Sequence, residues 1–412
     1  MDILRFITAG SVDDGKSTLI GRLLYDSKSI LTDQLEAIEK SSKNRNNGEI
    51  DLALLTDGLR AEREQGITID VAYRYFSTLN RKFIIADAPG HVQYTRNMVT
   101  GASNSDLVVI LIDARKGVIE QTRRHSIIAS LLGISKVFVT INKIDLVSYS
   151  EERYNEIVSE YEEVAKNLDI KDIQYFPVSA LNGDNIVDSS LFTPWYTGPT
   201  LLEALETVDV EPDVEHEESR FQVQLVIRPQ TPELHDYRGY AGRISSGKYK
   251  KGDQVRIFPS GIETVIDRIE FAGKEIPEAL AGESITILLK DEIDISRGDS
   301  IFHSQDVVNE TTEPEALICW LDEKPLQIGN KYLLQQGQRR VRAVVKEINF
   351  KLDVNTLQPS EVSEVRLNEV VKTKLKLQSP IAVDAYKTNK GNGSAILIDE
   401  TSHKTVAAVL FQ

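Results

Sequence analysis

Nine residues near the start of the chain, GSVDDGKST at 10–18, constrain its fold more than any other feature. They follow an apolar run, LRFITA (4–9), that predicts a β-strand, and they precede LIGRLLYD, which predicts a helix. A strand, a glycine-bounded loop ending in Gly-Lys-Ser and a helix together cradle phosphate, because backbone N–H groups and the helix N-terminus turn toward the anion. The sequence therefore predicts a phosphate loop at Gly10 to Ser17, in which Lys16 bridges the β- and γ-phosphates and Ser17 ligates Mg²⁺.

Strand-like runs alternate with helix-like segments through the first half of the chain. The expected strands lie at 4–9, 82–87, 107–114, 137–142 and 175–179, and the later ones are separated by EQTRRHSIIASLLG and SEERYNEIVSEYEEVAKNL. This alternation predicts an α/β P-loop domain, with a mostly parallel sheet and helices on both faces. The continuous apolar run LVVILI fits a strand that is buried on both faces.

The composition changes near residue 208. Residues 209–220, DVEPDVEHEESR, are acidic, contain proline and show no periodicity, which predicts an interdomain linker. Short β-rich runs separated by glycine turns follow, and a second set of them begins near residue 315. These patterns predict two all-β barrel domains. We therefore expect a nucleotide-binding domain at 1–208 and β-barrel domains at 219–306 and 312–412.

Composition limits the setting in which the chain works. Its 412 residues are enough for two or three domains. No apolar run approaches the roughly 20 residues that span a bilayer, and no charged-then-apolar leader is present, so neither membrane insertion nor secretion is expected. The single cysteine, Cys319, cannot form an internal disulfide, and the 6 histidines show no zinc-ligand spacing. A cytoplasmic protein is expected, and the net charge of −15 argues against broad nucleic-acid binding.

Two further segments are expected to face the γ-phosphate. DAPGH (87–91) follows the run KFIIA, so Asp87 can reach Mg²⁺ through water and Gly90 can offer its N–H to the γ-phosphate. EREQGITID (62–70) lies where a mobile loop should contact the metal, and Thr68 is its best candidate ligand. On pattern alone, an ordinary threonine at the entry to a strand explains Thr68 equally well. DAPG alone is a common turn, and its pairing with a phosphate loop favours the functional interpretation.

NKID (142–145) indicates which base is bound. It ends another strand, where the Asp145 carboxylate can accept both the N1–H and the 2-amino protons of guanine. Adenine lacks this pair of donors and would leave a desolvated carboxylate unpaired. Asn142 would link this loop to the phosphate loop, the stem of Lys143 would cover the base, and VSAL (178–181) would supply a backbone N–H for the guanine oxygen. GTP is therefore favoured over ATP.

Several motifs together carry a family resemblance. DGKST, REQGITID, DAPGHVQYTRNMVTGAS, QTRRH and NKID resemble the translation-factor GTPases of the elongation factor Tu superfamily, and GRISSGKYKKGDQVRI (242–257) is similar to their second-domain barrel. The pairing of VDDGKSTLIGRLL with DGLRAEREQGITID resembles more closely the large, GTP-hydrolysing subunits of bacterial sulfate adenylyltransferases, the ATP sulfurylases. The resemblance covers nearly the whole chain.

The resemblance implies roles for residues at matching positions. His91 falls where the family places the side chain that orients the attacking water, and Val12 and Ile67 match the apolar pair that gates it. A surface histidine after a turn is the plain alternative for His91. The expected catalytic residues are His91, Lys16 and Thr68, and the expected metal ligands are Ser17, Thr68 and Asp87. The expected nucleotide-binding residues are Gly10, Ser11, Val12, Asp13, Asp14, Gly15, Lys16, Ser17, Thr18, Asp87, Gly90, Asn142, Lys143, Asp145, Ser179, Ala180 and Leu181.

The resemblance also implies what the hydrolysis is for. GTP hydrolysis would drive ATP and sulfate to adenosine 5′-phosphosulfate and pyrophosphate, because the mixed anhydride formed is richer in free energy than the phosphoanhydride broken. The sequence contains no second G-x-x-x-x-G-K-S/T, no S-G-G-x-D-S loop and no H-x-G-H pair. A smaller ATP-binding subunit is therefore expected as partner, in a heterodimer or a higher assembly, and neither nucleic acid nor membrane is expected.

The alternative function is that of a translation factor that delivers aminoacyl-tRNA. Asp14 counts against it, because elongation factors of the Tu type carry histidine at the matching position. The C-terminal half also lacks obvious clusters of basic and aromatic residues. Asp13 is shared with the wider superfamily, and we hypothesise that it seats a monovalent cation or orients the loop. Nothing in the sequence explains an acid at position 14.

Overall fold

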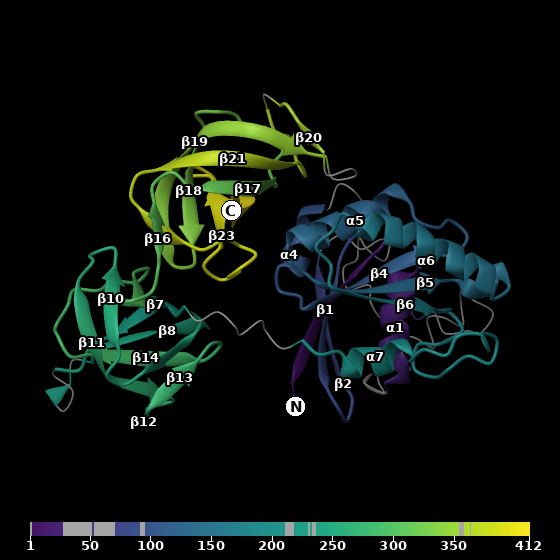
Figure 1. Cartoon of the computed structure of the whole chain (residues 1–412), viewed down its shortest axis with the longest axis horizontal. Coiled ribbons are helices and arrows are strands. Elements are labelled where there is room, and N and C mark those ends of the chain that lie inside the picture. The colour runs from purple at the N-terminus through teal and green to yellow at the C-terminus, as the bar shows by residue number, and fades with distance from the viewer. Residues whose placement is uncertain are drawn as a thin grey trace. The chain divides into compact units, whose positions relative to one another are not determined.

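The structure is a computed structural model that describes residues 2–27, 52, 71–90, 95–210, 218–229, 231–232, 236–353, 358–362 and 364–412. The chain divides into two compact units, of which the first ends at Val210. An α/β unit is followed by an all-β unit with two closed sheets (Figure 1), which confirms the predicted fold class. None of the helices in the described residues is long and apolar enough to cross a membrane.

The first unit is built on a 6-stranded sheet of order β2-β3-β1-β4-β5-β6. Its strands are β1 (Ile3–Ala9), β2 (Ala72–Ser77), β3 (Lys82–Asp87), β4 (Leu107–Asp113), β5 (Lys136–Asn142) and β6 (Asp172–Pro177). Its helices are α1 (Lys16–Asp26), α4 (Thr95–Ala102), α5 (Glu120–Leu131), α6 (Glu151–Ala165), α7 (Leu201–Thr207) and the short 3₁₀ helix η3 (Ile144–Val147). Only β2 runs antiparallel to its neighbour. The sequence does not predict β2, because its alternating exposed residues form no continuous apolar run.

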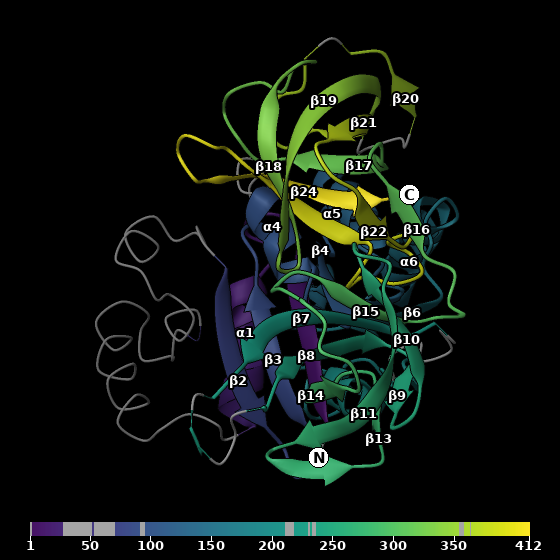
Figure 2. The ribbon, with the colours of Figure 1, turned by 90° about the vertical axis from the view of Figure 1, so that its left-hand side faces the viewer.

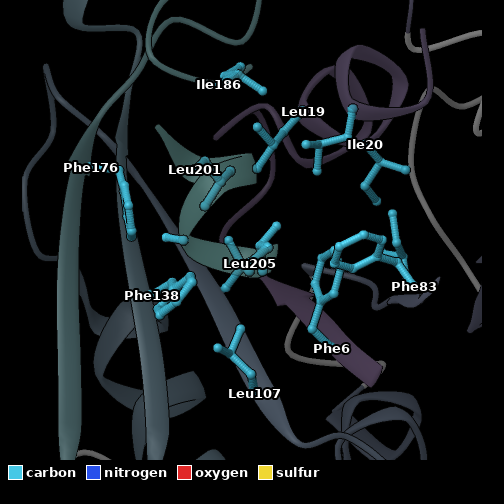
Figure 3. Packing of buried hydrophobic residues seen from close by; sticks show 14 of the residues in the cluster. Phe6, Leu19, Ile20, Phe83, Leu107, Phe138, Phe176, Ile186, Leu201 and Leu205 are labelled. Carbon is cyan, nitrogen blue, oxygen red and sulfur yellow. The ribbon is translucent and has the colours of Figure 1, made fainter. Parts of the chain in front are cut away.

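Helices cover both faces of this sheet, as predicted. The two helices α1 and α7 lie on one face, and α4, α5 and α6 lie on the other (Figure 1). Every residue of β4 is buried, as the run LVVILI predicts. On the α1–α7 face, side chains from the strands and from both helices form one hydrophobic cluster (Figure 3), which includes Phe6, Leu19, Ile20, Phe83, Leu107, Phe138, Phe176, Ile186, Leu201 and Leu205.

The carboxyl ends of the parallel strands lie along one edge of the sheet. The strand β1 pairs with β3 on one side and with β4 on the other, so the strand order reverses there. Open α/β sheets bind their ligands outside the carboxyl ends of the strands at such a reversal. The segments 10–17, 88–90, 143–145 and 178–181 directly follow β1, β3, β5 and β6, so the fold brings the predicted motifs to one edge.

The second unit contains two closed sheets. The first has the order β10-β15-β7-β8-β14-β11-β12 and is closed by the pairing of β10 with β11. It is built from β7 (Arg220–Ile227), β8 (Gly239–Ser246), β10 (Gln254–Phe258), β11 (Glu263–Phe271), β12 (Lys274–Ile276), β14 (Ser284–Leu289) and β15 (Ser300–His303), and β9 (Lys248–Lys250) pairs separately with β13 (Glu278–Leu280).

The second closed sheet has the order β18-β23-β24-β17-β21-β19-β20 and is closed by the pairing of β18 with β19. Its strands are β17 (Glu315–Trp320), β18 (Lys331–Gln336), β19 (Arg339–Leu352), β20 (Pro359–Ser360), β21 (Val370–Leu377), β23 (Ser394–Ile398) and β24 (Thr405–Phe411), and β16 (Asn309–Thr311) pairs separately with β22 (Ile381–Val383). Two register shifts against β21 accompany the strong curvature of β19 that Figure 2 shows. We keep 219–306 and 312–412 as the proposed barrel domains.

A buried arginine joins the two closed sheets of the second unit. Arg220 begins β7 and is 2% exposed. Its guanidinium donates two hydrogen bonds of 2.9 Å to the carboxylate of Asp384, which follows β22. Ion pairs of 2.5 Å to Glu218 and 3.5 Å to Asp306 complete the cluster. Removing such an arginine would leave partly buried carboxylates without a counter-charge, so the cluster is expected to hold the two sheets together.

Candidate nucleotide-binding site

The residues between β1 and α1 form a tight loop that requires glycine. Asp13 and Gly15 adopt left-handed backbone conformations, with φ of 67° and 95°. A β-carbon at Gly15 would lie 2.4 Å from the side-chain nitrogen of Asn142, so only glycine permits this approach. The loop leads into the N-terminus of α1, whose first turn contains no acidic side chain. This end of the helix is therefore suited to an anion.

The ammonium of Lys16 is buried and bonded to neutral carbonyls. Its Nζ donates hydrogen bonds of 2.8 Å to the carbonyls of Gly10 and Ser11, and it forms no ion pair within the described part of the chain. Burial lowers the pKa of this ammonium, although the charge of Asp87 acts in the opposite direction. A β-carbon at Gly90 would lie 2.6 Å from Nζ, so the segment after β3 packs directly on the phosphate loop. A buried ammonium bonded only to neutral carbonyls fits the oxygens of a phosphate group.

Asp14 points into the protein interior. It is 2% exposed, and its Oδ2 accepts a 2.5 Å hydrogen bond from the N–H of Ser11. Its Oδ1 is buried and has no hydrogen-bond partner among the described residues, and the ion pair with Lys116 is long, at 3.9 Å. Burial raises the pKa of this carboxyl. The acid that the sequence leaves unexplained therefore stabilises the first turn of the phosphate loop, by accepting a hydrogen bond from the N–H of Ser11 on the buried side of the loop.

Asn142, the last residue of β5, links three loops. It is 1% exposed, and its amide nitrogen donates a 2.7 Å hydrogen bond to the carbonyl of Asp14 in the phosphate loop. Its amide oxygen accepts a 2.9 Å hydrogen bond from the N–H of Ala180, after β6. One buried side chain thus joins the ends of β1, β5 and β6, and each polar atom of its amide is bonded.

Lys143 and Asp145 follow Asn142 and face different groups. Lys143 adopts φ of 60°, and its Nζ donates a hydrogen bond to the carbonyl of Asp13. Asp145 lies on η3 and is partly exposed, and its carboxylate forms no hydrogen bond or ion pair within the described ranges. A carboxylate that makes no such bond, two residues after a lysine bonded to the phosphate loop, is what recognition of paired ring and amino N–H donors requires.

The segment 178–181 is held from two sides. Ser179 is fully buried, and Arg22 of α1 donates a 3.2 Å hydrogen bond to the carbonyl of Ala180 and another to that of Leu181. Because Asn142 engages the N–H of Ala180, this N–H is not free for a guanine oxygen in the present conformation.

The metal side of the site contains Ser17 and Asp87. Asp87 ends β3 opposite Thr8, whose hydroxyl donates a 3.4 Å hydrogen bond to Oδ1 of Asp87. Ser17 lies in the first turn of α1 beside Thr18, and both are partly buried. No group of three or more His, Cys, Asp or Glu in the described ranges could hold a metal by itself. Mg²⁺ at nucleotide sites takes only one or two protein ligands beside phosphate and water, so Ser17 and Asp87 fit an ion that arrives with a nucleotide.

Several predicted residues cannot be placed. Thr68, Ile67 and His91 lie outside the described residues, and their roles remain predictions. Val12, the proposed partner of Ile67, is partly buried in the phosphate loop.

Sequence reasoning misses a polar face of α5. Gln121 donates a 3.3 Å hydrogen bond to the carbonyl of Gly90. One turn later His125 is 5% exposed, and burial lowers the pKa of its imidazole to about 3, with the charge of Lys16 adding to the effect. The i, i+4 spacing of these two polar residues within QTRRH, on a helix that covers the sheet, could have predicted that both lie on one side of the helix.

Comparison with known proteins identifies the family. The sequence model of the elongation factor Tu GTP binding domain matches residues 1–210, and that of the GTP-eEF1A C-terminal domain-like family matches residues 313–411. Sulfate adenylyltransferase subunit 1 of Bacteroides fragilis is 50% identical over 408 residues, which cover 98% of this chain and 85% of the relative. The protein of the same name from Sulfurovum sp. is 49% identical over 418 residues, covering 99% of this chain and 86% of the relative. The bifunctional enzyme CysN/CysC of Mycobacterium tuberculosis is 49% identical over 98% of this chain and 66% of its own length.

The similarity to these relatives extends over almost the whole of this chain, and it agrees with the nucleotide-binding loops found at the carboxyl edge of the sheet. The chain belongs to the sulfate adenylyltransferase subunit 1 family, and its first 210 residues are a GTP-binding domain of the elongation factor Tu type.

Proposed function

We propose that this chain is the GTPase subunit of a sulfate adenylyltransferase. Its hydrolysis of GTP would drive the formation of adenosine 5′-phosphosulfate and pyrophosphate from ATP and sulfate on a smaller ATP-binding subunit. The main observation behind this proposal is that Asn142 joins the phosphate loop, the NKID segment and the segment after β6. These are the three segments expected to contact the phosphates and the base of a guanine nucleotide. The identity of about half the residues to proteins named for this reaction supports the coupled chemistry.

The residues have separate proposed tasks in the hydrolysis. Lys16 and the N–H groups of the phosphate loop would stabilise the charge that develops on the β–γ bridging oxygen. Asp145 would select guanine, and His91 would orient the attacking water. When bound, Mg²⁺ would neutralise phosphate charge and would be held by Ser17, Thr68 and Asp87.

The partner, the cation and the location complete the proposal. The relatives are named as subunit 1 of sulfate adenylyltransferase, which supports a second subunit, and we propose a heterodimer or larger assembly in the cytoplasm. Asp13 is exposed at the rim of the loop, where it could contact a monovalent cation. Hydrolysis that is independent of potassium would count against that role.

The test compares two possible activators of GTP hydrolysis. GTP turnover by the purified chain is measured with a purified ATP-binding sulfate adenylyltransferase subunit, ATP and sulfate, and separately with ribosomes. We expect stimulation by the first mixture, with pyrophosphate released in step, and its loss in Lys16→Met. Stimulation by ribosomes alone would overturn the proposal in favour of a translation factor.

A further inference from the structure

A buried carboxylate at the end of β4 has no role so far. The side chain of Asp113 is fully buried, and it forms a 3.2 Å ion pair with Nζ of Lys143. Arg115 holds the same carboxylate from the outside, through contacts of 3.0 Å from Nε and 2.6 Å from a terminal nitrogen. Burial raises the pKa of Asp113, but the hydrogen bonds from Arg115 and Lys143 prevail and lower it to about 2. Asp113 is therefore ionised throughout the physiological range.

Lys143 occupies a position that needs such an anchor. Its side chain is 25% exposed, and its ammonium lies between the carboxylate of Asp113 and the carbonyl of Asp13 in the phosphate loop. A lysine stem has four rotatable bonds, and holding it in one conformation costs rotamer entropy. The ion pair with Asp113 opposes that cost before any nucleotide arrives.

The turn after β4 makes a second link to the phosphate loop. The N–H of Lys116 donates a 2.9 Å hydrogen bond to the carbonyl of Asp113, and the Lys116 side chain extends toward Asp14 at 3.9 Å. Residues 113–116 therefore contact both the NKID segment and the phosphate loop, from a strand that contributes no residue to the predicted site.

We propose that Asp113 is a positioning residue that acts through Lys143: it fixes the lysine stem against the phosphate loop and so slows release of the guanine nucleotide. The inference rests on the proposed function only in that a guanine nucleotide binds at this site. It does not depend on the partner subunit or on hydrolysis.

The test is a double-mutant cycle on nucleotide release. Dissociation of fluorescently labelled GDP is measured by stopped flow for the wild type, Asp113→Asn, Lys143→Gln and the double variant. Because a hydrogen bond to a charged group contributes more than a neutral one, we expect Asp113→Asn to accelerate release about tenfold to a hundredfold. In the Lys143→Gln background the same substitution should change the rate less than about twofold, since the group through which Asp113 acts is gone.

Asp106→Asn is the matched control. Asp106 immediately precedes β4, at the opposite end of the strand, and accepts a 2.9 Å hydrogen bond from the N–H of Arg5. The Asp106→Asn variant should release GDP at close to the wild-type rate, although the substitution removes a carboxylate beside the same strand. If Asp113→Asn does not fold, Arg115→Gln is used instead, because it removes the hydrogen bonds that the Asp113 carboxylate accepts from the guanidinium. We then expect a smaller acceleration of GDP release, which again vanishes in the Lys143→Gln background.

The outcomes separate this inference from the proposed function. Equal acceleration by Asp113→Asn in both backgrounds would mean a merely structural role and would overturn the inference, as would an unchanged rate. A wild type that binds no GDP would instead overturn the proposed function.

Discussion

Replacing Asp14 with asparagine is expected to stabilise the nucleotide-free protein. The 3.9 Å pair with Lys116 is worth about 4 kcal/mol at an effective dielectric constant of about 20. Lys116 is 42% exposed, and solvent screening reduces this to about 1 kcal/mol. Desolvating the carboxylate costs several kcal/mol and raises the pKa of Asp14, against the opposing effects of the hydrogen bond from Ser11 and of the charges of Lys16 and Lys116. Asparagine keeps an acceptor for the N–H of Ser11 without a charge, so the free energy of unfolding should rise at pH 7 by about 1 kcal/mol, the low end of the gain from replacing buried ionic groups.

The pH dependence gives the sign of the effect. Because the pKa of Asp14 is raised in the folded state, its contribution to stability is fully present below the unfolded pKa of about 4 and is lost as pH rises through the folded pKa. The stability difference between Asp14→Asn and the wild type should therefore grow from near zero at the acid end to its full value at neutral pH.

Urea unfolding measures this difference in the first unit. The chain contains 2 tryptophans, so in a Trp320→Phe background the fluorescence of Trp195 reports the first unit alone. Asp13→Asn, an exposed neighbour, is the control and should change stability by less than about 0.5 kcal/mol. A loss of stability in Asp14→Asn at pH 7, or a difference that does not change with pH, would refute the reasoning.

Three further substitutions test other parts of the structure. Asp145→Asn should shift nucleotide preference from GTP toward xanthosine triphosphate in a competition assay, and intact guanine selectivity would contradict the base assignment. Gly90→Ala should weaken GDP binding measured by calorimetry, because its β-carbon would lie 2.6 Å from both the Gly10 carbonyl and the Lys16 ammonium, and unaltered affinity would argue against that packing. Arg220→Met should lower the stability of the second unit by about 3–5 kcal/mol in urea unfolding followed through Trp320, whereas the exposed Arg243→Met should change it little. A similar loss in both variants would show that the buried cluster is not special.

The phosphate loop and the NKID segment could be predicted because their geometry restricts residue types. Asn142 approaches Gly15 so closely that the glycine is required, and its amide then determines which loops meet. Such constraints leave a visible pattern in the sequence.

Other parts of the site leave no comparable pattern. Asp113 is one acid at the end of an apolar run, and its importance depends on Lys143, which directly follows the next strand of the sheet, β5. Thr8 meets Asp87 only because β1 and β3 pair in a particular register. The 7-residue helix α7 is too short to be stable by propensity alone; its capping box and its packing on the sheet stabilise it, and the packing is a tertiary effect.

The ion cluster around Arg220 has a consequence for how the chain is made. Arg220 and Asp384 are separated by 164 residues, so during synthesis the arginine leaves the ribosome long before its bidentate partner exists. At typical elongation rates of about 5–20 residues per second, the interval is roughly 8–30 s. In the second half of this interval, once the first closed sheet has been made, the arginine is paired only with Glu218 and Asp306, and the surface that will contact the second sheet is still open. The final arrangement of the all-β unit is therefore a late step of folding, and until it is complete the unit is exposed to misassembly or to chaperone binding.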